Sequence, residues 1–289
     1  MTEILQQNES WIYFWAIVGT FSACTIAEMI APRRNVTADL AFRWVNNIGL
    51  AVVTTFIVKA VLTAAGVVTT WWAEKEQIGL LQWLAPAWWI SCLLVLLLLG
   101  LADYLYHRLL HAVPFLWRFH AVHHSDTDFD VTTTYRNHPL AAIILLGFRL
   151  PVIAALGAPV SALIFYELIR VTQDLWSHSN IKLPERVDKY LRYIAVTPDF
   201  HRIHHCSDRQ YTDSNFSSTV PWFDYLFGTY RNRPYDTHPT MEIGIERFRE
   251  LEESRLDQLL LMPLRVSNVT TGPDVDATKS GPLTGSPGQ

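Results

Sequence analysis

The chain has 289 residues, of which 50% are hydrophobic and only 17% are charged, and its mean hydropathy is +0.14. This balance is too apolar for an ordinary soluble domain, so we expect a membrane protein. A formal net charge of −4 without a basic patch excludes a nucleic-acid-binding role.

Three apolar runs are long enough to cross a bilayer core, which needs about 20 residues. They cover residues 11–31, 48–71 and 84–102. The third run continues to Pro114 without an evident stop signal, so one helix over residues 83–111 should carry both the span and the histidines that follow. A fourth apolar stretch, residues 140–169, is interrupted by charge, Pro and Gly. We expect it to form a tilted or re-entrant helical hairpin, buried among the spans.

The flanking charges predict the orientation of the spans. Arg33, Arg34 and Arg43 follow the first span, whereas the loop after the second span contains acidic residues such as Glu76. The arginine-rich side should be cytoplasmic, which places the amino terminus outside and the polar carboxy-terminal half inside. The first ten residues are polar and acidic, so no cleavable signal peptide is expected. The three cysteines have no C-x-x-C spacing, which is typical of a reducing compartment.

Eight of the eleven histidines fall into three clusters with fixed spacing. These are His107 and His111 (H-x3-H), His120, His123 and His124 (H-x2-H-H), and His201, His204 and His205 (H-x2-H-H). Residues three or four apart share one face of a helix, and adjacent histidines can serve neighbouring metal centres. A lone histidine is more often a core or surface residue than a ligand, but three clusters exceed what one ion can bind. The pattern therefore predicts two metal ions in one pocket.

The segments around the clusters also carry local signals. Residues 115–125 should form a short helix, residues 126–134 a polar loop, and Thr197 and Pro198 the cap and first turn of the third helix. Residues 241–262 read as an amphipathic helix, on the membrane surface or on the protein's own cytoplasmic face. We expect one domain over residues 1–266, with a histidine core at about 96–231, and a disordered tail at 267–289.

The setting of the histidines narrows their chemistry. No glutamate lies between His107 and His111, which disfavours a zinc hydrolase, and the clusters follow or lie between the spans rather than within them, which disfavours a transporter. Two redox-active ions at the membrane surface, beside a helical bundle, instead suit oxygen activation for attack on an unactivated C–H bond. A non-catalytic membrane metal-handling protein remains the alternative from another class.

The ordered clusters and their surroundings resemble the membrane-bound fatty acid hydroxylase and sterol desaturase superfamily. The segments that carry the resemblance, between residues 31 and 231, are DYLYHRLLHAVPFLWRFHAVHHSD, TTYRNHPL, DLWSHSNIKLP, TPDFHRIHH and PWFDYLFGTY. The apolar runs and the charge bias predict an all-α integral membrane bundle of three spans and a hairpin, with a cytoplasmic, helical, histidine-rich cap. The resemblance implies that this cap binds two iron ions. These segments are similar to those of bacterial members of the superfamily, so the resemblance also implies a location in a bacterial inner membrane.

The activity that the resemblance implies is oxygen-dependent hydroxylation or desaturation of a membrane lipid, such as a fatty acyl chain or a sterol. Molecular oxygen is the cosubstrate, and a separate reductase with a ferredoxin or cytochrome carrier must supply electrons, because the sequence has no G-x-G-x-x-G fingerprint. Ether-lipid cleavage of the alkylglycerol monooxygenase kind is an alternative within the same superfamily.

Some single residues extend the candidate site. The resemblance implies that His178 is a further ligand; His138 is a second candidate, whose alternative role is to open the helix beside Pro139. Asp174 or water is another way to complete the metal shell. His238 is expected to be a surface residue. Three acids near the family motifs either orient ligand histidines or are ordinary surface acids: Asp103, Asp199 and Asp224.

Overall fold

The computed structural model describes residues 8–36 and 39–266, and in these residues the fold is all-helical, as the sequence predicts. Only two isolated β-bridges occur there, and no strand. The elements are α2 (Glu9–Ile30), α3 (Leu40–Lys75), α4 (Leu80–Leu84), α5 (Trp88–Ala112), α6 (Pro114–His124), η1 (Val131–Tyr135), α7 (Pro139–Leu156), α8 (Val160–Ser177), α9 (Glu185–Leu191), α10 (Pro198–His204), α11 (Arg209–Thr212), α12 (Trp222–Leu226), η2 (Tyr235–Thr237), η3 (Leu251–Ser254) and α13 (Leu256–Arg265). The tail expected at 267–289 lies outside the described residues.

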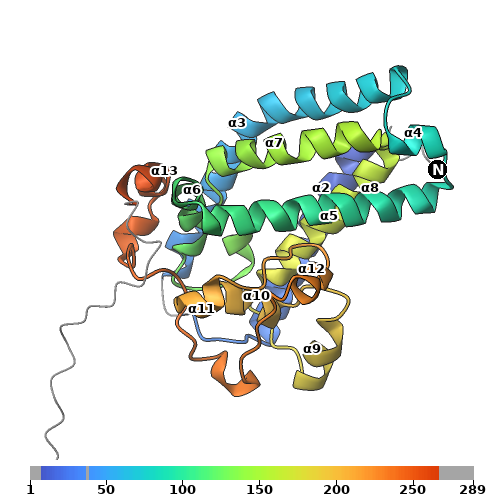
Figure 1. Ribbon diagram of the computed structural model, residues 1–289. Coiled ribbons are helices and arrows are strands. Elements are labelled where there is room, and N and C mark those ends of the chain that lie inside the picture. The colour runs from blue at the N-terminus through green and yellow to red at the C-terminus, as the bar shows by residue number, and fades with distance from the viewer. Residues whose placement is uncertain (1–7, 37–38, 267–289) are drawn as a thin grey trace, which may run out of the picture.

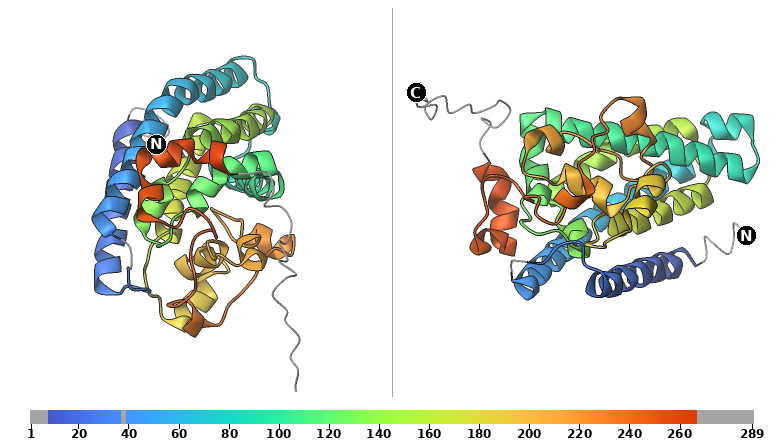
Figure 2. Two further views of the ribbon diagram at one scale, coloured as in Figure 1. Left: turned by 90° about the vertical axis from the view of Figure 1, so that its left-hand side faces the viewer. Right: turned by 90° about the horizontal axis from the view of Figure 1, so that it is seen from below.

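Five long helices, α2, α3, α5, α7 and α8, form a bundle (Figure 1). Helix α5 packs against both α7 and α8, while α3 lies along α7 and α2 along α8. Helix α2 forms one edge of the bundle in both views of Figure 2. Buried Val95, Leu99 and Tyr166 belong to the apolar cluster that joins α5 to the hairpin. Close van der Waals packing of this kind is what holds helices together in lipid.

In the part of the chain that the structure describes, four helices are long and apolar enough to cross a membrane, judged by length and composition. Three of these segments, Ser10–Ile30, Leu40–Val58 and Trp88–Ala112, overlap the expected spans. The fourth is Pro139–Leu156, the first arm of the expected hairpin. Arg149 and Pro151 lie inside this helix without ending it. The bundle is therefore built from one more helix of spanning length than the sequence indicated.

Helix α5 carries both a candidate span and the first histidine cluster, as expected. It begins at Trp88 rather than near residue 83, because Pro86 follows α4 and Ala85 adopts a left-handed conformation with φ 41°. At about 1.5 Å per residue, its 25 residues extend about 37 Å, beyond a hydrocarbon core of about 30 Å. His107 and His111 lie in its last two turns.

The tip of the α7–α8 hairpin packs on the connection between α3 and α5. Gly79 and Gly157 both have positive φ, and Gln82 Nε2 donates to Gly157 O at 3.0 Å. Figure 1 places α4 at one end of the bundle and α6 and α13 at the other. The hairpin thus reaches the end of the bundle that is remote from the histidine clusters.

Replacing Gly157 with Ala tests this contact. A Cβ there would lie 2.3 Å from Ile78 O and 3.0 Å from Gly79 Cα, in a backbone with φ +56°. Since the left-handed conformation alone costs roughly 1–2 kcal/mol for other residues, we expect a loss of at least about 2 kcal/mol and a lower melting temperature in detergent. In Gly147→Ala, inside the helix α7 that Gly157 caps, the new Cβ meets nothing within 4 Å, so this variant should not lower the melting temperature. Equal melting of the two variants would contradict the close approach.

The segment 241–262 is not the single amphipathic helix that the sequence predicted. Gly244 and Phe248 have positive φ, and Ile243 pairs with Cys206 in a β-bridge, so residues 241–250 are irregular before η3 and α13 begin. Tertiary hydrogen bonds, such as Gly244 N to His205 O at 3.1 Å, replace helical ones. Its apolar residues pack with α13 against α6 and α3, which is the second of the two expected locations.

Candidate metal centre

The first two clusters lie on consecutive helices that meet at a sharp turn. Val113 is extended, and Pro114 starts α6 at its first helical position, where a missing N–H costs nothing. His107 and His111 end α5, and His120 and His124 lie one turn apart on α6. His120 therefore reaches back to α5, and His107 Nε2 lies 2.9 Å from His120 Nε2.

The third cluster is carried by α10, whose start matches the sequence prediction. Thr197 caps the helix by accepting a hydrogen bond from Phe200 N at 3.2 Å, and Pro198 is its first residue. The cluster, like the second one, lies at the carboxyl end of its helix, and its adjacent residues His204 and His205 face different groups of histidines. His178, at the end of α8, lies between the second and third clusters, 3.1 Å from His123 Nε2 and 3.0 Å from His201 Nε2.

Nine histidines form two groups. Within each group, the candidate ligand atoms all lie within 4.8 Å of one another. The five-histidine group contains His107, His111, His120, His124 and His204, and the four-histidine group contains His123, His178, His201 and His205. Both adjacent pairs of the sequence, at 123 and 124 and at 204 and 205, are divided between the groups. The structure thus brings together every clustered histidine and His178, in the two-centre arrangement that the spacing predicted.

Backbone carbonyls and one carboxylate orient several rings from outside. The Nδ1 atoms of three rings lie at hydrogen-bond distance from carbonyl oxygens: His107 from Phe216 at 2.7 Å, His178 from Asp174 at 2.8 Å and His204 from Ser214 at 2.7 Å. The Nδ1 of His111 lies 3.0 Å from Asp213 Oδ1. Because a carbonyl only accepts, these contacts place a proton on Nδ1 and leave the Nε2 lone pair for a metal.

Burial favours the neutral form of His178 and of the imidazoles in the second and third clusters. Burial lowers the pKa of His178 to about 4, and it lowers the pKa of six others well below their ordinary value, with further lowering by neighbouring rings. Those six are His120, His123, His124, His201, His204 and His205. Neutral imidazole is the form that binds a transition metal, so the electrostatics of the site suit metal binding without proton release.

The unpaired ring nitrogens also fit bound metal. Five of the nine histidines have buried ring nitrogens without a hydrogen-bond partner in the described residues: His111 Nε2, His123 Nδ1, His201 Nδ1, His204 Nε2 and both nitrogens of His205. Leaving a polar atom buried and unpaired costs about 1–3 kcal/mol. Metal coordination would satisfy such atoms, and it would also convert the close nitrogen pairs into shared coordination.

His138 and Asp174 do not join either group. His138 caps α7, where its Nδ1 accepts from Leu140 N at 3.2 Å and its Nε2 donates to Leu260 O at 3.3 Å. Both ring nitrogens are therefore used, in the helix-opening role that was the alternative for this residue. The Asp174 carboxylate instead pairs with Arg170 at 2.8 Å, although its backbone carbonyl orients His178.

The three acids predicted near the motifs are buried structural residues rather than surface acids, and none contacts a ring nitrogen of the nine histidines in the described residues. Asp224 acts one step away, because it accepts from Phe216 N and Ser217 N, both at 2.8 Å, and so fixes the loop whose carbonyl orients His107. Asp213 is the carboxylate that does face a ring, and sequence reasoning missed it. Its contact with His111 spans 102 residues, so no local spacing signals it.

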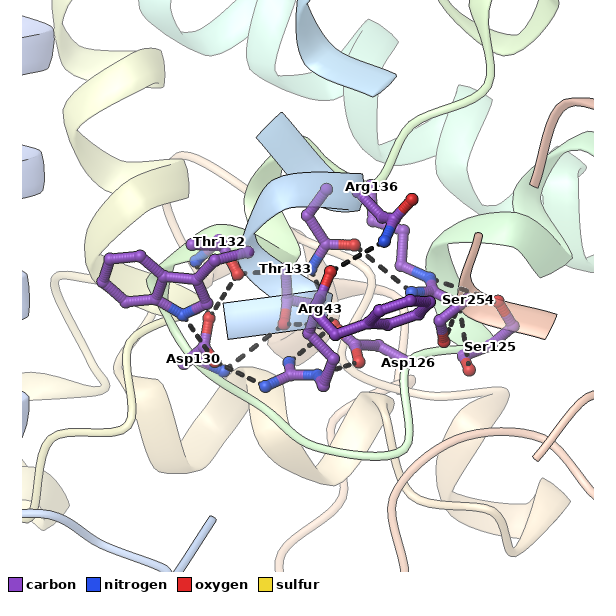
Figure 3. Close-up of polar contacts among 12 residues, drawn as sticks. Arg43, Ser125, Asp126, Asp130, Thr132, Thr133, Arg136 and Ser254 are labelled. Atoms are coloured by element: carbon purple, nitrogen blue, oxygen red, sulfur yellow. Dashed lines mark hydrogen bonds and ion pairs between the residues drawn. The ribbon is translucent and has the colours of Figure 1, made fainter. Parts of the chain in front are cut away.

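Buried ion pairs fix the end of α6 (Figure 3). Figure 3 shows the Arg43 guanidinium between Asp126 and Asp130, with distances of 2.7 Å from Nε to Asp126 and 2.7 Å from Nη1 to Asp130. Arg136 donates to Val122 O at 3.0 Å and Ser125 Oγ at 2.9 Å, at the carboxyl end of α6. Burial alone would raise the pKa of Asp126, but Arg43 and Arg136 hold it well below its ordinary value. The second cluster is thereby tied to α3.

A cavity of about 360 Å³ reaches the histidines from the bundle. Five candidate ligands line it, namely His107, His120, His123, His178 and His201. Apolar side chains of α3 and α7, including Val58, Leu145 and Leu146, form another part of its wall. A larger apolar groove of about 900 Å³ lies between α2 and α3, but no histidine lines it, so the smaller cavity is the candidate substrate site.

His238 is buried, which corrects the expectation of a surface residue. Its side chain is 1% exposed, and its Nδ1 lies 3.6 Å from Asp199 Oδ1, beneath α10. Its backbone carbonyl accepts from Arg34 Nη1 at 2.7 Å. Burial lowers the pKa of His238 to about 3, so the ring is neutral. No local pattern around His238 indicates this burial, because its neighbours come from the α2–α3 connection and from α10.

We expect His238→Ala to destabilise the protein by about 1–3 kcal/mol, since it empties a buried site and removes a ring that contacts the base of α10. Thermal unfolding in detergent measures this loss, and metal content should stay unchanged because His238 belongs to neither group. Asp236→Ala, two residues away and exposed, is the control. Equal melting temperatures of the two variants would show that the His238 ring does not contribute to stability.

The segment that carries the histidines is similar to known proteins. Residues 92–229, which include both histidine groups, match the family model for fatty acid hydroxylase. Alkylglycerol monooxygenase of Xenopus tropicalis is 29% identical over 153 residues, which cover 52% of this chain and 32% of that protein. Ornithine lipid hydroxylase of Rhizobium tropici is 30% identical over 163 residues, 55% of this chain and 48% of the relative.

A third relative, a very-long-chain aldehyde decarbonylase of Oryza sativa subsp. indica, is 35% identical over 156 residues, 51% of this chain and 57% of the relative. The chain thus spans between a third and somewhat over half of the length of these three relatives. No solved structure matches the chain.

Proposed function

We propose that this chain, which belongs to the fatty acid hydroxylase superfamily and is an integral membrane protein, is an oxygen-dependent di-iron hydroxylase or desaturase of a membrane lipid. The observation that carries the proposal is the pair of histidine groups, in which eight buried imidazoles and the partly buried His107 lie at one end of a helical bundle. One domain, residues 1–266, would contain both the membrane helices and this site.

The two groups would each hold one metal ion, with five and four imidazole nitrogens in reach. Imidazole also suits zinc and copper, so the donor set alone does not select iron. The absence of a glutamate beside His107 and His111, and the relatives named hydroxylase and monooxygenase, favour a redox metal over hydrolytic zinc. Two iron ions bound there would supply oxygen activation.

The residues of the chain would bind and orient the lipid. Val58, Leu145 and Leu146 offer an apolar wall to an alkyl chain in the cavity that reaches the histidines. An alkyl chain bound against this wall would displace water, which protects a reactive site from side reactions. Hydroxylation puts one oxygen atom into a C–H bond and releases the other as water, which consumes two electrons and two protons. Desaturation removes two hydrogens from the substrate instead.

The relatives also support an alternative substrate within the same chemistry. A relative named alkylglycerol monooxygenase suggests attack beside an ether oxygen, and one named ornithine lipid hydroxylase suggests attack on a polar lipid. Electrons would come from a separate reductase with a ferredoxin or cytochrome carrier, because the sequence has no dinucleotide fingerprint and no cysteine set for an iron–sulfur cluster.

The decisive experiment combines metal analysis with lipid products. Protein purified under anaerobic conditions should contain about two irons per chain, since the ligands exceed what one ion can use. Lipid extracts of cells that express the gene should gain a species with one more oxygen or two fewer hydrogens, and the purified protein should consume oxygen only with lipid and reductant. One zinc per chain in active protein would contradict the di-iron proposal, and metal binding without turnover would favour a metal-handling protein.

Variants make the same test residue by residue. His124→Ala and His205→Ala, one from each group, should lower product formation by at least about 100-fold and reduce the iron content. His138→Asn is the matched control, because Asn is a good helix cap and His138 lies outside both groups. Loss of iron in His138→Asn would make that residue a ligand after all.

We further propose that the histidine end of the bundle faces the cytoplasm, in a bacterial inner membrane, where reductant is available. The support is the arginine bias: Arg33, Arg34 and Arg43 lie at the histidine end, and Glu76 lies in the connection that follows α3. In addition, Arg33 and Arg43 pair with Asp199 and Asp126 of the histidine-bearing cap.

Single cysteines in a cysteine-free background test the orientation. With a membrane-impermeant thiol reagent, Glu76→Cys should be labelled in intact cells, whereas Lys189→Cys on α9 should be labelled only after permeabilisation. Both positions are exposed in the structure, so neither depends on local unfolding. Labelling of Lys189→Cys alone in intact cells would invert the orientation and the direction of electron supply.

A further inference from the structure

Four charged side chains line the cavity that reaches the histidines. They are Asp103 from α5, Arg149 from α7, and Arg170 and Asp174 from α8. Ionisable groups among membrane helices are costly, and they are retained where they pair with one another or meet a polar ligand. Each of these four must therefore be assigned a partner.

Asp103 and Arg149 satisfy each other and do not need a ligand. Arg149 Nε donates to Asp103 Oδ1 at 2.7 Å, and its Nη1 donates to Glu167 Oε1 at 3.0 Å. Tyr166 donates its hydroxyl to the second oxygen of Asp103 at 2.5 Å. The side chains of Arg149 and Asp103 are only 11% and 7% exposed. This pair forms a closed part of the wall.

Arg170 and Asp174 are only partly satisfied. Arg170 Nε donates to Glu167 Oε2 and its Nη1 donates to Asp174 Oδ2, both at 2.8 Å. Among the side chains that the structure describes, none forms a hydrogen bond with Arg170 Nη2 or Asp174 Oδ1. Their side chains keep 23% and 20% of their surface accessible while they line the cavity. The pair therefore offers one donor and one acceptor to a molecule bound there.

The position of this pair relates it to the metal centre. Asp174 lies one helical turn before His178, and its backbone carbonyl accepts the Nδ1 proton of that ring at 2.8 Å. A water molecule occupies about 30 Å³ in the liquid, so 360 Å³ holds about a dozen groups of that size. A group bound at Arg170 and Asp174 and a carbon presented to the histidines thus share one small space.

A bare hydrocarbon would fill this space poorly. It would cover Arg170 Nη2 and Asp174 Oδ1 without replacing the hydrogen bonds that water gives them, which costs more for charged groups than for neutral ones. The apolar wall of Val58, Leu145 and Leu146 suits the alkyl part of the molecule. The cavity as a whole matches an amphipathic end of a lipid better than the middle of a chain.

We propose, on the basis of the function proposed above, that Arg170 and Asp174 bind a hydroxyl or amide group of the lipid substrate, one that both donates and accepts hydrogen bonds. The attacked carbon then lies within a few bonds of that polar group. The pair determines specificity and touches the substrate, while Arg149, Asp103 and Glu167 hold it in place.

The binding step is tested with two probes, 1-hexadecanol and hexadecane, which share one alkyl chain and differ only in the hydroxyl group. Each is added to detergent-solubilised protein whose metal content has been measured. Tryptophan fluorescence and the shift of the melting temperature report binding without turnover. Wild-type protein should bind 1-hexadecanol at least about tenfold more tightly, because a hydrogen bond to a charged group is made only with the alcohol. Equal binding of the two probes would overturn the proposal.

Variants separate recognition from packing. The charge-neutral double variant Asp174→Asn with Arg170→Gln, and the single variant Asp174→Asn, should reduce the preference for 1-hexadecanol to about twofold or less. Asp188→Asn is the matched control, since it neutralises one carboxylate of the buried Asp188–Arg192 pair, which does not line the cavity. It should keep the preference. If Asp188→Asn loses the preference to the same extent, the effect comes from a general loss of packing and the proposal fails.

Turnover distinguishes this proposal from the function on which it rests. If wild-type protein consumes no oxygen with any lipid, the hydroxylase proposal fails, yet the preference between the two probes still reports on the pair. If it oxidises 1-hexadecanol, mass spectrometry locates the new functional group. Oxidation within the first few carbons from the hydroxyl is expected, and oxidation in the middle of the chain would overturn the specificity proposal while leaving the hydroxylase intact.

Discussion

The structure depends on collecting nine imidazoles, eight of them buried, at one end of the bundle. A protonated ring in the second or third cluster would face several neighbouring rings within a few ångströms, so burial and proximity together favour the neutral form. Hydrogen bonds from outside then decide which nitrogen remains free, through the carbonyls of Phe216, Asp174 and Ser214. The orientation of the site is thus built into loop backbones as much as into the histidines.

Buried ion pairs bring the required elements together. Arg33 ties the α2–α3 connection to Asp199 on α10, and Arg43 ties α3 to Asp126 after α6. Removing one partner of such a pair leaves an uncompensated buried charge, which costs about 3–5 kcal/mol. The arginines that sequence analysis used only as topological signals therefore also join the membrane helices to the cap. The cap and the bundle are not separable layers.

The fold and most of the site follow from local sequence signals. Fixed spacing identified all eight clustered histidines, and Thr197 with Pro198 marked the start of α10, because caps and helical faces are properties of short segments. Long-range contacts were not accessible in this way. Asp213 and the buried His238 are set by neighbours far away in the chain. The prediction of one helix over 241–262 was wrong because Phe248 adopts a positive φ that suits its tertiary contacts. The periodicity of apolar residues carries no information about such contacts.

The division of adjacent histidines between the two groups has a consequence for assembly. His123 and His124 share one peptide unit, as do His204 and His205, yet each member serves a different group. The first ion to bind would therefore immobilise the last turn of α6 and of α10, and much of the ordering required for the second ion would already be complete. Loading should be cooperative, with empty and fully loaded protein favoured over the singly loaded form.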